Sequence, residues 1–74
     1  MATITFEGQT IDYDAKAVKR WSVQKMLVQG GAETYKAVDI ILCGRSDDVA
    51  LLFGDDADKM TELLTAIGSL AAKN

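Results

Sequence analysis

Hydrophobic and polar residues alternate along the first part of the chain. Between Ala2 and Glu7 the alternation places Ile4 and Phe6 on one face of an extended segment. A second alternating run covers residues 10–13, after Gly8. The pattern predicts a β-hairpin over residues 1–13 that turns at Gly8. Because a two-stranded hairpin is barely stable by itself, we expect it to pack on the rest of the chain.

After Asp14 the apolar positions follow a helical spacing, but in two phases. Residues 15–21 fit one helical face, and the apolar residues within 23–27 fit another. This change predicts a boundary at Ser22, whose hydroxyl would cap a helix over residues 23–29, with Gly30 just beyond its end. A single continuous helix from Ala15 is the alternative.

Residues 32–43 are predicted to form the next helix, which ends before Gly44. At 100° per residue, Tyr35, Val38 and Leu42 lie on one stripe, whereas Ile40 lies on the polar side beside a lysine. We expect this helix to be central and buried nearly all round, with Ile40 covered by another element or by a partner. A buried strand over residues 38–43 remains the alternative.

Two acid-rich segments predict the starts of the last two helices. Ser46 is the expected N-cap of a short helix over residues 47–53, with acids in its first turn and Gly54 after its end. Asp55 and Asp56 repeat this arrangement before a longer helix. Its apolar face is formed by Met60, Leu63, Leu64, Ile67 and Ala71.

Seventy-four residues form one small domain, 1–74, since two independent cores would each be too small. We predict an α+β, mostly helical fold in which a short N-terminal β-hairpin (1–13) packs on three to four α-helices (15–73). The apolar content of 49% allows a core, but a thin one. We therefore expect either efficient helix packing or stabilisation by association with other molecules.

The composition argues against most functions that need particular side chains. The chain has no His and one Cys, so a Cys/His zinc site and an internal disulfide are excluded. We expect no catalytic residues, no cofactor and no metal, and hence no enzyme. The net charge of −3 disfavours nucleic-acid binding, and no apolar run is long enough for a membrane span. A reducing cytoplasm is the expected compartment, because the N-terminus lacks the regions of a signal peptide.

The charges are divided along the chain. A basic segment, residues 15–25, carries Lys16, Lys19, Arg20 and Lys25 without an acid. An acidic segment, residues 46–62, carries six acids against Lys59 alone. If the fold keeps these segments apart, copies of the domain can attract one another head to tail. If it brings them together, they neutralise each other within one molecule, which is the more ordinary arrangement.

Two single residues have competing interpretations. Trp21 is the only Trp, and we expect it in the core, where it would bury about 200 Å². On the surface beside Arg20 it would instead be an interface anchor. Cys43 has no His to activate it, so we expect small core filler rather than a nucleophile.

The order of motifs resembles the small tail assembly chaperones of phages and prophages of Gram-positive bacteria. The resemblance covers most of the chain. It is carried above all by Ile-Leu-Cys-Gly-Arg-Ser-Asp-Asp at residues 41–48, Leu-Phe-Gly-Asp-Asp at 52–56, and Glu-Leu-Leu at 62–64 in the terminal helix. Earlier parts of the pattern are the hairpin that ends in Ile-Asp-Tyr-Asp and the sequence Trp-Ser-Val-Gln-Lys at residues 21–25.

The resemblance implies a non-enzymatic protein of the bacterial cytoplasm that binds the tape-measure protein, or another tail protein, during tail assembly and is not retained in the mature virion. Weak self-association is expected from the divided charge. The alternative is a small acidic phage or bacterial regulator that inhibits a host protein by binding, which requires the acids to form one continuous exposed face. The candidate partner-binding residues are Lys16, Lys19, Arg20, Trp21, Ile40, Asp47 and Asp48.

Overall fold

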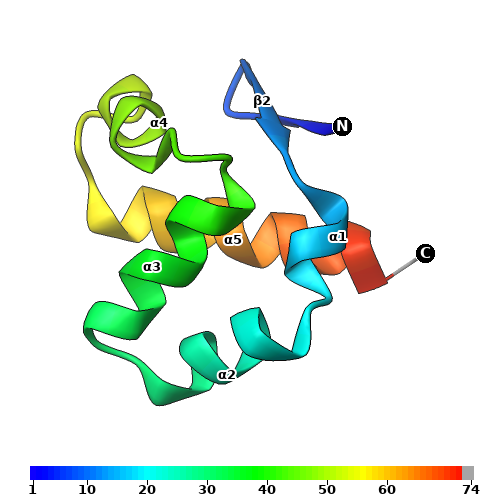
Figure 1. Ribbon diagram of the computed structural model, residues 1–74. Coiled ribbons are helices and arrows are strands. Elements are labelled where there is room, and N and C mark those ends of the chain that lie inside the picture. The colour runs from blue at the N-terminus through cyan, green and yellow to red at the C-terminus, as the bar shows by residue number, and fades with distance from the viewer. Residues whose placement is uncertain (73–74) are drawn as a thin grey trace.

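The chain folds into an N-terminal β-hairpin followed by helices, in a computed structural model that describes residues 1–72 (Figure 1). The elements are β1 (Ala2–Phe6), β2 (Gln9–Tyr13), α1 (Ala15–Val18), α2 (Trp21–Gln29), α3 (Ala32–Ile41), α4 (Ser46–Leu52) and α5 (Ala57–Ala72). The predicted α+β class is confirmed, with five helices in residues 1–72 where three to four were expected. Lys73, the last residue of the predicted helical part, lies outside the described residues.

The hairpin has the predicted alternation. β1 and β2 are antiparallel, with Ile4 opposite Ile11, and both side chains are buried. The strand ends one residue earlier than expected, because Glu7 belongs to the turn. Glu7 and Gly8 have φ angles of 47° and 81°, and two successive positive values match the twist of a two-residue hairpin turn.

Contacts at both ends hold the hairpin on the helices, among them an ion pair of 3.8 Å between Asp12 Oδ2 and Arg45 Nη1. The rings of Phe6 and Phe53 meet edge to face, with centroids 5.4 Å apart. Glu7 accepts a hydrogen bond of 2.7 Å from Lys59 Nζ at the start of α5. At the other end of the hairpin, the backbone N–H of Asp14 donates to the carbonyl oxygen of Ile41 over 2.9 Å.

The predicted break in the basic segment is confirmed, and the continuous helix is wrong. The boundary lies at Lys19–Arg20 rather than at Ser22, which lies inside α2. Asp14 caps α1 by accepting from the N–H groups of Lys16 and Ala17. Arg20 is extended and precedes α2 without a side-chain cap, and Gln24 Nε2 donates to the Val18 carbonyl across the break. Ser22 therefore has no capping role.

α3 is a helix, so the alternative of a strand over residues 38–43 is wrong. It ends at Ile41, two residues before the predicted end, and its C-cap is Leu42. Cys43 follows with a φ angle of 59° in a left-handed turn that leaves the residue exposed, so the prediction of core filler is also wrong.

α3 is buried on one side only, contrary to the expectation of burial nearly all round. Its core face is formed by Ala37, Val38 and Ile41. Tyr35, predicted to share the buried stripe, is 76% exposed because no element covers it and its ring borders an open groove.

The cap of α4 comes from α3 rather than from the predicted Ser46. Ser46 is the first residue of the helix and donates from both its backbone N–H and its hydroxyl to Asp39 Oδ1, over 3.3 and 2.7 Å. Asp47 and Asp48 occupy the first turn, as predicted, where the helix dipole favours negative charge.

α5 is the longest helix and agrees with its prediction. Asp56 Oδ1 accepts hydrogen bonds from the N–H groups of Asp58 and Lys59, as an N-cap residue does. Leu63, Ile67 and Ala71 are buried along one face.

Within residues 1–72, every helix is too short or too polar to cross a lipid bilayer.

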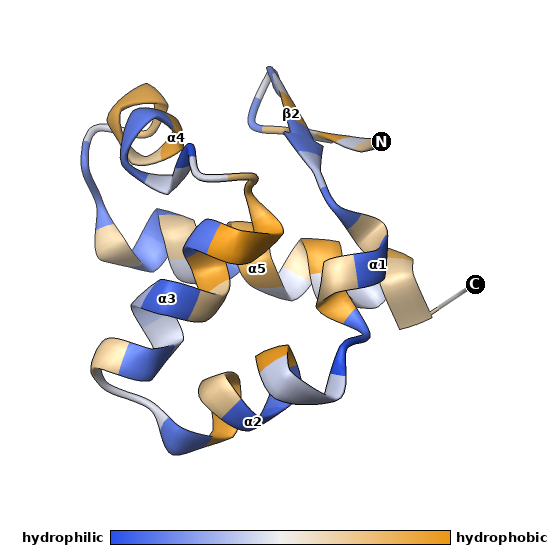
Figure 2. Ribbon diagram, in the orientation of Figure 1, coloured by the Kyte–Doolittle hydropathy of each residue, from blue (hydrophilic) through white to orange (hydrophobic). Residues whose placement is uncertain are grey.

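The core lies where the hairpin, α3 and α5 meet. In Figure 2 apolar colours mark the C-terminal part of α3, much of α4 and parts of α5. Leu42, Leu63 and Ile67 are the largest fully enclosed side chains together with Val23 of α2. Since α2 contributes only this one fully buried residue, most of its surface remains available.

Candidate functional site

The predicted partner-binding residues are all exposed, but they lie in three separate places. One place is the junction of α1 and α2, which is formed by Lys16, Lys19, Arg20 and Trp21. The segment that connects these two helices is coloured as hydrophilic in Figure 2. Ile40 lies on α3 and is 36% exposed. Asp47 and Asp48 lie on α4, which is at the opposite end of the molecule from α2 in Figure 1.

The basic and acidic segments do not neutralise each other. Within residues 1–72, none of the four cations of the basic segment forms an ion pair. The ion pairs found there join Lys36 with Glu33, Arg45 with Asp12, and Lys59 with Glu7 and Glu62. The more ordinary arrangement is therefore wrong for this chain, because α3 separates α2 from α4 (Figure 1).

Trp21 is on the surface, 79% exposed, so its predicted core position is wrong. At 100° per residue it lies about 200° around the helix from the buried Val23. Val28, one heptad later, is 86% exposed on the same side. We call this side the outer face of α2; its residues are Trp21, Gln24, Lys25, Val28 and Gln29.

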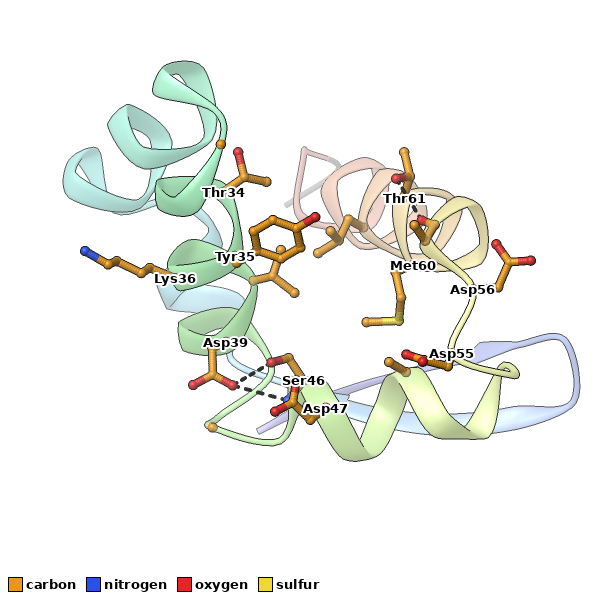
Figure 3. A pocket seen from close by; sticks show the side chains of 16 residues that line it. Thr34, Tyr35, Lys36, Asp39, Ser46, Asp47, Asp55, Asp56, Met60 and Thr61 are labelled. Atoms are coloured by element: carbon orange, nitrogen blue, oxygen red, sulfur yellow. Dashed lines mark hydrogen bonds between the residues drawn. The ribbon is translucent and has the colours of Figure 1, made fainter.

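A groove of about 840 Å³ lies between α3, α4 and the start of α5 (Figure 3). We call it the acidic groove, since four aspartates and one lysine contribute to it. Its lining residues are Gly31, Thr34, Tyr35, Lys36, Val38, Asp39, Gly44, Ser46, Asp47, Ala50, Asp55, Asp56, Ala57, Met60, Thr61 and Leu64.

The interior of the acidic groove is apolar, and its rim is charged. Figure 3 shows Tyr35 and Met60 pointing into the space from opposite walls. Asp47 and Asp55 lie along the α4 side, whereas the Lys36 side chain points away. The groove therefore presents apolar surface with negative charge beside it, which suits a partner that carries apolar and basic side chains together.

The groove gathers a tyrosine, a lysine and aspartates, so its chemistry has to be considered. The hydrogen bonds drawn among its lining residues join Asp39 to Ser46 at the start of α4 and the Thr61 hydroxyl to the Ala57 carbonyl within α5. Neither Tyr35 nor Lys36 is hydrogen-bonded to an aspartate within residues 1–72. No group of three or more metal-ligating side chains comes together in that part of the chain.

Lys59 has a structural role beside the groove. Its hydrogen bond to Glu7 and the charge of that carboxylate raise the pKa of Lys59, with smaller contributions from Glu62 and Asp56. Loss of water around the ammonium group opposes this shift. The charged form of Lys59 therefore helps to hold the hairpin on α5.

Sequence reasoning identified the charges and offered Trp21 as a partner-binding residue, but it missed Val28 on the outer face and the apolar residues of the acidic groove. Val28 could have been found, because it follows Trp21 by seven residues on one helix. Tyr35, Met60 and Asp55 could not be joined into one groove, since they meet only when α3, α4 and α5 are packed.

The chain matches no family model, no curated protein and no solved structure.

Proposed function

We propose that the protein is a non-enzymatic phage tail assembly chaperone that binds the tape-measure protein in the bacterial cytoplasm and self-associates weakly. The observation that carries the proposal is the separation of two surfaces of opposite character. On the outer face of α2, part of the basic segment lies beside exposed apolar side chains. In the acidic groove, aspartates lie beside apolar side chains. Such surfaces support many weak contacts along a long client.

The strength of these contacts fits a protein that later releases its client. Each surface is open and partly polar, and exposed charges interact weakly in water. Screening by salt weakens them further, since the Debye length is about 10 Å at 0.1 M ionic strength. A scaffold that has to leave the finished particle benefits from contacts of this kind.

The roles of the acids favour this function over an inhibitor that presents carboxylates to a host enzyme. Asp39 and Asp56 accept hydrogen bonds at the starts of α4 and α5. Asp47 and Asp48 occupy the first turn of α4. The start of each helix thus accounts for the positions of these acids, which an inhibitor would arrange as one continuous face.

The direct test is binding to fragments of a candidate tape-measure protein. Calorimetric titration of the folded protein is expected to show binding at about 0.01 M ionic strength and marked weakening at about 1 M. Absence of binding by any fragment at the lower ionic strength, with the protein shown to be folded, would overturn the proposal. Fragments of an unrelated helical protein provide the control.

A further inference from the structure

We propose that the outer face of α2 of one copy docks into the acidic groove of a second copy, so that copies join head to tail. This inference rests on the self-association part of the proposed function and gives it a defined contact. It is carried by the complementarity of two surfaces that a single molecule cannot bring together.

The two surfaces match in charge and in apolar content. The outer face presents Trp21 and Val28 with Lys25 between them, and it contains no acid. The groove presents Tyr35 and Met60 with Asp47 and Asp55 beside them. Docking covers exposed apolar side chains on both partners and brings Lys25, the one charged residue of α2, to the acidic rim of the groove.

The pairing has to be between molecules. α2 packs its opposite side, with Val23 fully buried and Met26 and Leu27 partly buried, against the core of its own chain. Trp21 and Val28 therefore point away from the molecule. Since the outer face and the groove are different patches, the contact is heterologous, and repeated contacts give a ring or an open chain rather than a closed dimer.

The contact is small enough to be reversible. α2 has nine residues, which corresponds to a length of about 14 Å. Standard interfaces cover about 800 Å² on each partner, and the whole chain exposes 4780 Å². A single short helix covers less than a standard interface, so we expect a weak contact in which Trp21 contributes most.

Two complementary variants test the contact. The face variant, Trp21→Glu with Lys25→Glu, leaves the groove intact. The groove variant, Tyr35→Lys with Asp47→Asn, leaves the outer face intact. All four positions are exposed, so circular dichroism and thermal melting are expected to show both variants folded. Ser69→Glu, an exposed change on α5 outside both surfaces, is the matched control.

Sedimentation equilibrium at about 0.01 M ionic strength distinguishes the outcomes. The unchanged protein and Ser69→Glu are expected to form species larger than dimers. Each variant alone is expected to lose about tenfold or more in affinity and remain monomeric. Their mixture is expected to form a one-to-one dimer and nothing larger, because one intact face meets one intact groove. The fluorescence of Trp21, present only on the groove variant, is then expected to shift to the blue.

The inference is overturned if the unchanged protein is monomeric under these conditions, if either folded variant assembles like it, or if the mixed variants stay monomeric. Binding of tape-measure fragments is measured on the same samples. Client binding without self-association would overturn this inference and leave the client part of the proposed function standing. A dimer in the mixture without any client binding would support the inference and overturn that part of the function.

Discussion

α5 and α2 use similar apolar residues in opposite ways. α5 begins at a capping aspartate, Asp56, and buries Leu63, Ile67 and Ala71 along one face. α2 begins without a side-chain cap and fully buries only Val23, while Trp21 lies in water. Burial of apolar surface is the main favourable term in folding. α5 therefore stabilises the domain, and the exposed apolar residues of α2 are available for contacts with other molecules.

The largest effect is expected from Leu63→Ala on α5. Removal of a fully buried leucine costs about 2–5 kcal/mol in the free energy of unfolding, enough to unfold much of a domain of this size. Urea denaturation measures the loss. Leu51→Ala is the matched control on the surface and should change stability by about 0.5 kcal/mol or less. Equal effects of the two substitutions would contradict the assignment of the core.

A smaller effect is expected from Asp56→Ala at the start of α5. The substitution removes the acceptor for two backbone N–H groups, which costs about 1 kcal/mol. Thermal melting measures the change. Asp56→Asn keeps the capping oxygen and should retain most of the stability, so an equal loss in both variants would show that charge rather than capping matters here.

A third prediction concerns the ion pair that joins α5 to the hairpin. Because the folded state raises the pKa of Lys59, the stabilisation is complete below the unfolded value of about 10.4 and is lost as pH rises through the folded value. Glu7→Gln should therefore destabilise the protein at neutral pH and have less effect well above that range. Glu33→Gln, which alters a pair within one helix, controls for the change in net charge. If Glu7→Gln lowers stability by the same amount at every pH, the stabilisation does not come from the ion pair with Lys59.

The smallest effect on stability is expected from Trp21→Ala on α2. Its side chain is largely in water, so the free energy of unfolding should change by about 0.5 kcal/mol or less. Self-association should fall sharply in sedimentation experiments on the same variant. Destabilisation comparable to that of Leu63→Ala would remove the contrast between the two helices.

The sequence predicted the parts of the fold that depend on local pattern. Strict alternation identified the hairpin, and the apolar face around Leu63 identified α5. Trp21, Tyr35 and Cys43 were misplaced for different physical reasons. The helix of Trp21 packs on its other side, Tyr35 has no element above it, and Cys43 lies in a left-handed turn.

The candidate site was predictable only in part. The divided charge was visible in the sequence, but its separation in space depends on how α3 lies between α2 and α4 (Figure 1). The cap that Asp39 provides to Ser46 crosses from one helix to the next, and helix-start rules favour the local serine instead. The groove is a product of tertiary packing and leaves no periodic signal.

The hairpin's contact with Lys59 has a consequence for how the chain folds during synthesis. Glu7 and Lys59 are 52 residues apart, and closing a loop of that length costs about 3–4 kcal/mol of chain entropy beyond a constant term. The hairpin leaves the ribosome before the residues that hold it, and it is barely stable without them. Until α5 is made, Ile4 and Ile11 lack the part of the core that Leu63 and Ile67 contribute. The interval between these two events is therefore the time at which the nascent chain is most prone to aggregate.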